Sequence, residues 1–203
     1  MRKRTVLLVT CLGLALNTVA VPPVLRAAGG APAPWYGQEF SATLVRTFPR
    51  GPAGKRTARL FVGSTGMRLE DPQGLTYIYD ARAGRTWILF PGRKQFVETK
   101  GPGPLADLLP KPGGNPCAGI ADRNVTCRKT GSERVNGRLA DRWELQFRVG
   151  DKKLVAFRWV DRQLGVPVRV VTYEGAKVDL TDVRVARQPG NLFRIPPDYR
   201  PGR

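Results

Sequence analysis

Apolar and polar residues alternate along most of the chain from residue 40 onward, which is the pattern of β-strands with one buried face. The clearest case is the stretch 142–149, where Trp143, Leu145 and Phe147 alternate with charged or polar residues. Weaker stretches of the same kind recur at 40–45, 58–62, 67–70, 75–79, 87–89, 95–97, 154–159, 166–173 and 178–185. About ten short strands with almost no helix predict a mainly β fold, either a sandwich or a barrel.

Turn residues separate these stretches at short intervals. Asn136-Gly137 favours a two-residue hairpin turn directly before the clearest strand. Asp71-Pro72-Gln73-Gly74, Ala83-Gly84 and Pro91-Gly92-Arg93 separate the strands of the first half. This order predicts antiparallel hairpins that follow one another within one domain.

The pattern lapses between residues 100 and 127, where glycine and proline are frequent. Inside this insertion, Leu105-Ala106-Asp107-Leu108-Leu109 predicts about one and a half helical turns, which are too short to be stable unless they pack on the sheet. Two interpretations stay open. The segment is a lid or plug over one face of the sheet, or it covers an open sheet edge.

The first 27 residues have the features of a secretory signal peptide. Basic residues at 2–4 precede an apolar run at 6–16, and small residues follow near Ala20 and Ala27, the two predicted cleavage points. The run is about half of the roughly 20 residues that cross a bilayer, which disfavours a retained membrane anchor. We therefore expect a signal peptide (1–27), a flexible lead-in (28–37) and a single β domain (38–203) in the periplasm.

After cleavage the mature chain keeps two cysteines, Cys117 and Cys127. An even number of cysteines in an oxidising compartment predicts a disulfide between them. The segment between the two has no histidine and few carboxylates, which disfavours a metal site.

The composition excludes several classes of function. The chain has no histidine, so the usual general base, zinc ligand and pH switch are missing, and we expect neither an enzyme nor a cofactor. Its 34 Lys and Arg against 16 Asp and Glu give a net charge of +18, and the mature chain stays strongly basic. Such a surplus attracts anionic lipid headgroups or polysaccharides, while export makes nucleic acid the least available partner.

Aromatic residues are distributed over many of the predicted strands. On a strongly curved sheet, the residues of one face converge, so these side chains either line a cavity or fill a packed core. The aromatic set is Phe40, Tyr77, Tyr79, Trp87, Phe96, Trp143, Phe147, Phe157 and Trp159.

Several short motifs occur in a distinctive order. The first half holds Phe40-Ser41-Ala42, Gly66-Met67-Arg68-Leu69-Glu70 and a stretch from Asp80 through Trp87 to Phe96. The second half holds the stretch from Cys127 to Trp143, which includes Val135-Asn136-Gly137, and the closing stretch from Leu192 to Tyr199. Together these motifs resemble small periplasmic proteins related to the LolA/LolB-like outer-membrane lipoprotein carriers, over about residues 38–200.

The resemblance implies an open, unclosed β-barrel, formed by a single curved antiparallel sheet around a helical lid. In the carriers the apolar concave face holds lipid acyl chains, and their cargo-contacting arginine would correspond to Arg68. The carriers also begin with an amphipathic helix, which Pro32 and Pro34 preclude here. The segment 105–109 is therefore the candidate for a lid.

We therefore expect a monomeric exported protein, in the periplasm and in contact with the outer membrane or an anionic envelope surface, that holds a lipid or lipidated protein. The alternative is an envelope sensor or interaction module that binds a protein partner through the same sheet. The predicted ligand-binding residues are Phe40, Leu44, Leu60, Met67, Arg68, Tyr77, Trp87, Trp143, Phe147, Phe157 and Trp159.

Overall fold

The computed structural model describes residues 38–49, 54–108, 115–117 and 124–202. All of them belong to one compact unit, Ala33–Arg203. The predicted signal peptide (1–27) and lead-in (28–37) lie outside the described residues. In the part of the chain that is described, no helix has the length and apolar character needed to span a membrane.

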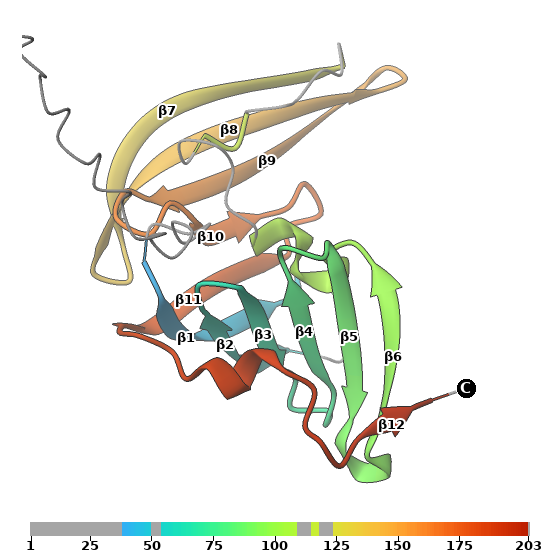
Figure 1. Cartoon of the computed structure of the whole chain (residues 1–203). Coiled ribbons are helices and arrows are strands. Elements are labelled where there is room, and N and C mark those ends of the chain that lie inside the picture. Colours follow the sequence, from blue (N-terminus) through green and yellow to red (C-terminus); the bar gives the residue numbers. More distant parts are fainter. Residues whose placement is uncertain (1–37, 50–53, 109–114, 118–123, 203) are drawn as a thin grey trace, which may run out of the picture. The chain divides into compact units, whose positions relative to one another are not determined.

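The described strands form one sheet with the order β12-β6-β5-β4-β3-β2-β1-β11-β10-β9-β8-β7 (Figure 1). Neighbouring strands pair antiparallel, except for the short parallel pair β12 and β6. The strands are β1 (Phe40–Thr47), β2 (Lys55–Val62), β3 (Gly66–Glu70), β4 (Thr76–Asp80), β5 (Arg85–Phe90), β6 (Gln95–Lys100), β7 (Val125–Val135), β8 (Arg138–Val149), β9 (Lys152–Asp161), β10 (Pro167–Val171), β11 (Lys177–Val185) and β12 (Arg200–Pro201). Short 3₁₀ helices are η1 (Pro91–Arg93), η2 (Gly103–Leu108) and η4 (Gly190–Phe193).

The curved sheet does not close, because its edge strands β12 and β7 do not pair with each other. This confirms the predicted open, mainly β fold. The sheet has 12 described strands, against about ten predicted. The sequence pattern missed β7, which is exposed along most of its length and so lacks an apolar stripe, and β12, which has only two residues.

The hairpin between β7 and β8 turns on two residues, as Asn136-Gly137 predicts. Asn136 has φ 49° and Gly137 has φ 81°, both in the left-handed region that this tight turn requires. The Asn136 side chain also donates a hydrogen bond of 2.8 Å from Nδ2 to the carbonyl oxygen of Leu180 on β11. The turn is thereby attached to the middle of the sheet.

Each face of the sheet carries its own apolar layer. We call the face that carries Leu44, Leu60 and Leu180 the inner face, and the opposite one the outer face. Directly paired residues on neighbouring strands share a face, so the register assigns each side chain to the inner or the outer face. Leu105 and Leu108 of η2 are buried in the core cluster with Leu44 and Leu60, which places η2 against the inner face.

The C-terminal segment packs on the outer face of β2 to β5. Phe193 of η4 is 8% exposed and lies so close to Gly63 that a Cβ there would come within 2.3 Å of its ring. Phe61, Ile78 and Leu89 are buried hydrophobic residues of this second layer. Both faces of this half of the sheet are therefore covered.

The predicted disulfide is present in the structure. Cys117 and Cys127 are bonded, with their Cα atoms 5.5 Å apart. Cys127 pairs with Leu145 across β7 and β8, so it lies on the same face as Trp143 and Phe147. Closing this short loop stabilises the fold by about 3 kcal/mol on the chain-entropy model.

We predict that Asp141 makes the fold sensitive to acid. Burial opposes its ionisation, but hydrogen bonds from Lys129, Ser132 and Arg162 outweigh burial and lower the pKa from 3.8 to about 2. Because the folded-state pKa lies below the unfolded one, Asp141 contributes stability above about pH 4 that is lost as the pH falls toward 2. Urea unfolding of wild type and Asp141→Asn should show a wild-type advantage near neutral pH that shrinks below about pH 3. An advantage of equal size at both pH values would contradict this assignment.

Candidate functional site

The register divides the predicted ligand-binding residues between the two faces of the sheet. Leu44 pairs with Leu180, and Arg46 pairs with Val178 on β11. Val178 in turn pairs with Val170 on β10, Val170 with Arg158 on β9, and Arg158 with Trp143 on β8. The inner face therefore carries Phe40, Leu44, Leu60, Met67, Tyr77, Trp143 and Phe147.

The other four predicted residues lie on the outer face by register. Arg68 and Trp87 both pair with Ile78, which belongs to the outer layer. The Arg68 guanidinium donates to Glu70 (2.9 Å) and to the carbonyl oxygen of Leu192 (3.2 Å). Trp87 donates from Nε1 to Glu98 (2.9 Å). Neither side chain faces the inner layer, so these residues do not share a surface with the seven inner-face residues, and their contact with a ligand stays a prediction.

Phe157 and Trp159 stack with arginine on the outer face of β8 to β10. Arg142 lies 4.4 Å from the centroid of Phe157 and 5.6 Å from that of Trp159, and Arg169 lies 5.8 Å from Trp159. Arg142 on β8 pairs directly with Trp159 on β9, so the two share a face. Trp143, the next residue on β8, lies on the other face. Both aromatic rings still contact the core cluster, close to the register shift between β9 and β10.

At the centre of the inner face the structure shows a packed core. Phe40, Leu44, Leu60 and Met67 are at most 1% exposed and belong to one cluster with Leu105 and Leu108 of η2. Of the two interpretations of the aromatic and aliphatic residues, a filled core therefore holds in this region. Contact of these four with a ligand stays a prediction that requires η2 to move.

The inner face is hollowed where β1, β10 and β11 meet η2. A cavity of about 300 Å³ lies there, lined by Arg46, Phe48, Leu108, Val170, Lys177 and Val178, among others. A second cavity of about 510 Å³ shares Phe48 and Ala176 with it and is also lined by Pro49, Tyr173 and Glu174. Phe48 and Tyr173 are 37% and 54% exposed, so apolar surface continues from the cavities to the solvent.

Trp143 and Phe147 extend this inner surface along β8. Val170, which lines the smaller cavity, pairs with Arg158, and Arg158 pairs with Trp143, so all three lie side by side on the inner face. Leu145, Leu154 and Ala156 lie between or opposite the two aromatic residues on that face. Trp143 Nε1 is buried and has no hydrogen-bond acceptor within the described structure, so it is a donor available to a polar ligand atom.

Comparison with known proteins identifies a fold and no sequence family. No family model matches the sequence, and neither does a curated protein. MucB aligns with a TM-score of 0.53 at 16% identity, covering 83% of this chain and 61% of the MucB chain. MucB from the Pseudomonas aeruginosa MucA/MucB complex aligns with a TM-score of 0.53 at 17% identity, covering 83% and 59%.

The chain shares the fold of MucB. It spans about three fifths of the length of the MucB chains. The structural neighbours also include a LolA superfamily protein from Nitrosomonas europaea, with a TM-score of 0.37 and 12% identity, covering 78% of this chain and 90% of that one.

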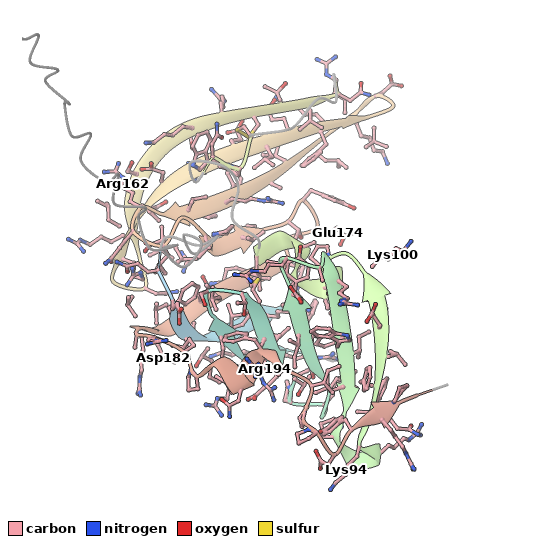
Figure 2. The ribbon with its side chains drawn as sticks, in the orientation of Figure 1. Lys94, Lys100, Arg162, Glu174, Asp182 and Arg194 are labelled. Atoms are coloured by element: carbon pink, nitrogen blue, oxygen red, sulfur yellow. A yellow bond between two sulfur atoms is a disulfide. The ribbon has the colours of Figure 1, made fainter. Side chains whose placement is uncertain are left out.

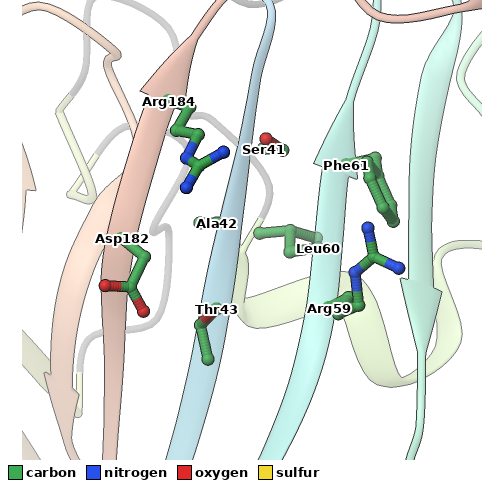
Figure 3. A pocket seen from close by; sticks show the side chains of 8 residues that line it. All are labelled: Ser41, Ala42, Thr43, Arg59, Leu60, Phe61, Asp182 and Arg184. Atoms are coloured by element: carbon green, nitrogen blue, oxygen red, sulfur yellow. The ribbon is translucent and has the colours of Figure 1, made fainter.

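In this MucB-like fold, a polar pocket of about 340 Å³ opens on the outer face of β11, β1 and β2 (Figure 3). Arg184 and Asp182 reach over it from β11, and Arg59 and Phe61 from β2 (Figure 3). Asp182 has φ 51° and lies at the register shift in the pairing of β1 with β11. The sequence gives no warning of this pocket, because the shift is a feature of the strand pairing.

The charged side chains are spread over the surface. Figure 2 labels Lys94, Lys100, Arg162 and Arg194, which come from four different parts of the MucB-like sheet and its C-terminal segment. Several basic residues are paired, as Lys94 is with Asp198 (2.9 Å) and Arg85 with Glu98 (3.1 Å). Among the described residues, no three His, Cys, Asp or Glu side chains are grouped so that they could hold a metal ion.

Sequence reasoning missed several residues that line the inner cavities. The pattern puts Leu108 in the predicted helical segment, and Val170 and Val178 in predicted strands, but it assigns none of them to a site. Arg46, Phe48 and Tyr173 were also missed. Their only signal in the sequence is a position at or beyond a strand end, and the pairing of β1 with β11 brings them together.

Proposed function

We propose that this protein is an exported periplasmic binding protein that holds a hydrophobic or amphiphilic ligand, such as a lipid or the acyl chain of a lipoprotein, on the inner face of its sheet. The observation that carries this proposal is the apolar cavity beneath Leu108. Its lining residue Val170 is linked by strand pairing, through Arg158, to Trp143 on the same face. Its volume is at the lower end of the range of ligand sites. A chain bound there therefore extends into the neighbouring cavity or along Trp143 and Phe147.

The energetics favour such binding. Burying a twelve-carbon chain would contribute roughly 8 to 10 kcal/mol at about 0.8 kcal/mol per CH₂, before the costs of association. The insertion that carries η2 is attached at two points, by the buried Leu105 and by the disulfide of Cys117 with Cys127. We infer that η2 acts as a lid over the inner face, which is one of the two interpretations that the sequence left open.

Native mass spectrometry of the full chain purified from an envelope extract tests this proposal. We expect a co-purifying mass of a few hundred daltons or more that is released by organic solvent. A protein that is free of ligand, and that does not take up added long-chain lipids, would contradict it.

A second candidate function is binding of a protein partner, and the fold shared with MucB favours it, since one of the matched structures is a MucA/MucB complex. For this chain, such a partner would use the same sheet, without lipid transport. A tagged, exported chain that recovers one envelope protein while free of lipid would support this function in place of the first.

A further inference from the structure

Two arginines face each other across β1 and β2, next to the smaller cavity: Arg46 lines it, and Arg56 lies over Phe48, which also lines it. Arg46 near the end of β1 pairs directly with Arg56 near the start of β2. Directly opposed residues on neighbouring strands have Cβ atoms about 5 Å apart, so like charges there are destabilising. No carboxylate among the described residues forms an ion pair with either guanidinium.

The surroundings of this pair are apolar on the inner side. Arg46 lines the cavity together with Phe48, Leu108, Val170 and Val178, and Arg56 lies over the Phe48 ring at 5.9 Å. Lys177 also lines the cavity, but it is bound to Asp179 at 2.9 Å. The result is an apolar floor with two cationic groups at its rim.

We propose that the ligand of this site is an anionic single-chain amphiphile, whose carboxylate or phosphate binds between Arg46 and Arg56 while its alkyl chain lies under Leu108. This inference rests on the proposed binding function and specifies its ligand class. A guanidinium binds carboxylate and phosphate oxygens in a bidentate manner, and an anion between the two arginines removes their repulsion.

The same geometry explains why Arg68 does not hold the headgroup. Its guanidinium is on the outer face, where Glu70 and the Leu192 carbonyl oxygen already accept its hydrogen bonds. Arg46 and Arg56 are on the inner face with the cavity. The arginine that the family resemblance assigns to the cargo is therefore replaced by a different pair.

Isothermal titration calorimetry on the full mature chain tests the inference with four probes: dodecanoate, dodecyl phosphate, dodecanol and inorganic phosphate. We expect both anionic amphiphiles to bind more tightly than dodecanol. Arg46→Gln and Arg56→Gln should each weaken the anionic amphiphiles about tenfold, and leave dodecanol within about twofold. Arg184→Gln, on the outer face, is the matched control and should change none of the affinities.

The outcomes separate this inference from the proposed function. If dodecanol and dodecanoate bind equally and neither arginine variant changes this, the binding function stands and the ligand class is wrong. If no amphiphile binds, both are wrong. If inorganic phosphate alone binds tightly, and this binding is lost in the same variants, the site binds an anion without contacting an alkyl chain. That result would also overturn the inference.

A thermal melt of the same variants gives an independent readout. Because Arg46 and Arg56 repel each other in the free protein, Arg46→Gln should melt at the same temperature as wild type or higher. A lower melting temperature would show that the pair stabilises the fold and would contradict the premise.

Discussion

Replacing Phe147 with aspartate should abolish amphiphile binding while the protein stays folded. Phe147 lies on the inner face and is only half-buried, so the sheet tolerates a polar side chain there. A bound alkyl chain, however, loses its contact with the ring and meets a carboxylate in its place. The loss of apolar contact and the burial of a charge together predict a weakening of at least about 100-fold.

The control for this experiment is Val155→Asp. Val155 pairs with Gln146 and so lies on the outer face of β9, one residue from the inner-face Leu154 that pairs with Phe147. It is also half-buried, which makes the chemical change closely matched. Uptake of a fluorescent fatty acid, measured together with a thermal melt, checks both variants. Folded Phe147→Asp protein that binds the probe as wild type does would rule out the path along Trp143 and Phe147 and leave the second cavity, beside Pro49 and Tyr173, as the place of the alkyl chain.

Replacing Leu105 with alanine should reduce the free energy of unfolding by about 2 to 5 kcal/mol. Leu105 is 0% exposed although its helix η2 has only six residues and cannot be stable alone. Its side chain belongs to the core cluster with Leu44, Leu60 and Leu180, so truncation leaves a cavity in that cluster. Urea unfolding with a spectroscopic signal checks this value.

The neighbouring residue supplies the matched control for Leu105. Ala106 is exposed in the same 3₁₀ helix, and Ala106→Ser should change the unfolding free energy by no more than about 0.5 kcal/mol. A loss below about 1 kcal/mol for Leu105→Ala would show that η2 is not part of the cooperative core. In that case η2 would be a freely moving lid, and the packed centre of the inner face would open easily to a ligand.

The two attachment points of the insertion, η2 and the disulfide, contribute to the stability of the fold and also lie next to the proposed binding surface. Leu105 and Leu108 close the inner face over β1 to β3, while the disulfide fixes Cys117 to β7 beside Leu145. The cavity next to Leu108 lies at the rim of the closed region. On the proposed binding function, a ligand would therefore enter at Arg46 and Phe48, beside Leu108 of η2.

The sequence by itself determined the local structure of this protein. Alternation of apolar and polar residues located ten of the 12 described strands, because each strand with one buried face carries its own pattern. Asn136-Gly137 specified the two-residue turn, since its conformation depends on those two residues alone. The disulfide followed from the two cysteines that remain after the predicted signal peptide is removed, and the lid candidate from one short apolar segment.

The tertiary structure alone decided which of these residues meet. Alternation shows that Trp143 and Arg142 point to opposite faces, but which residues of other strands share the face of Trp143 depends on register and on bulges between distant segments. For that reason Trp87, Phe157 and Trp159 separated from Trp143 and Phe147, and Arg68 from the inner face. The same pairing brought Arg46 opposite Arg56, and Arg46 lines a cavity together with η2. A site made by contacts between strands is encoded in their pairing and in no single stretch of sequence.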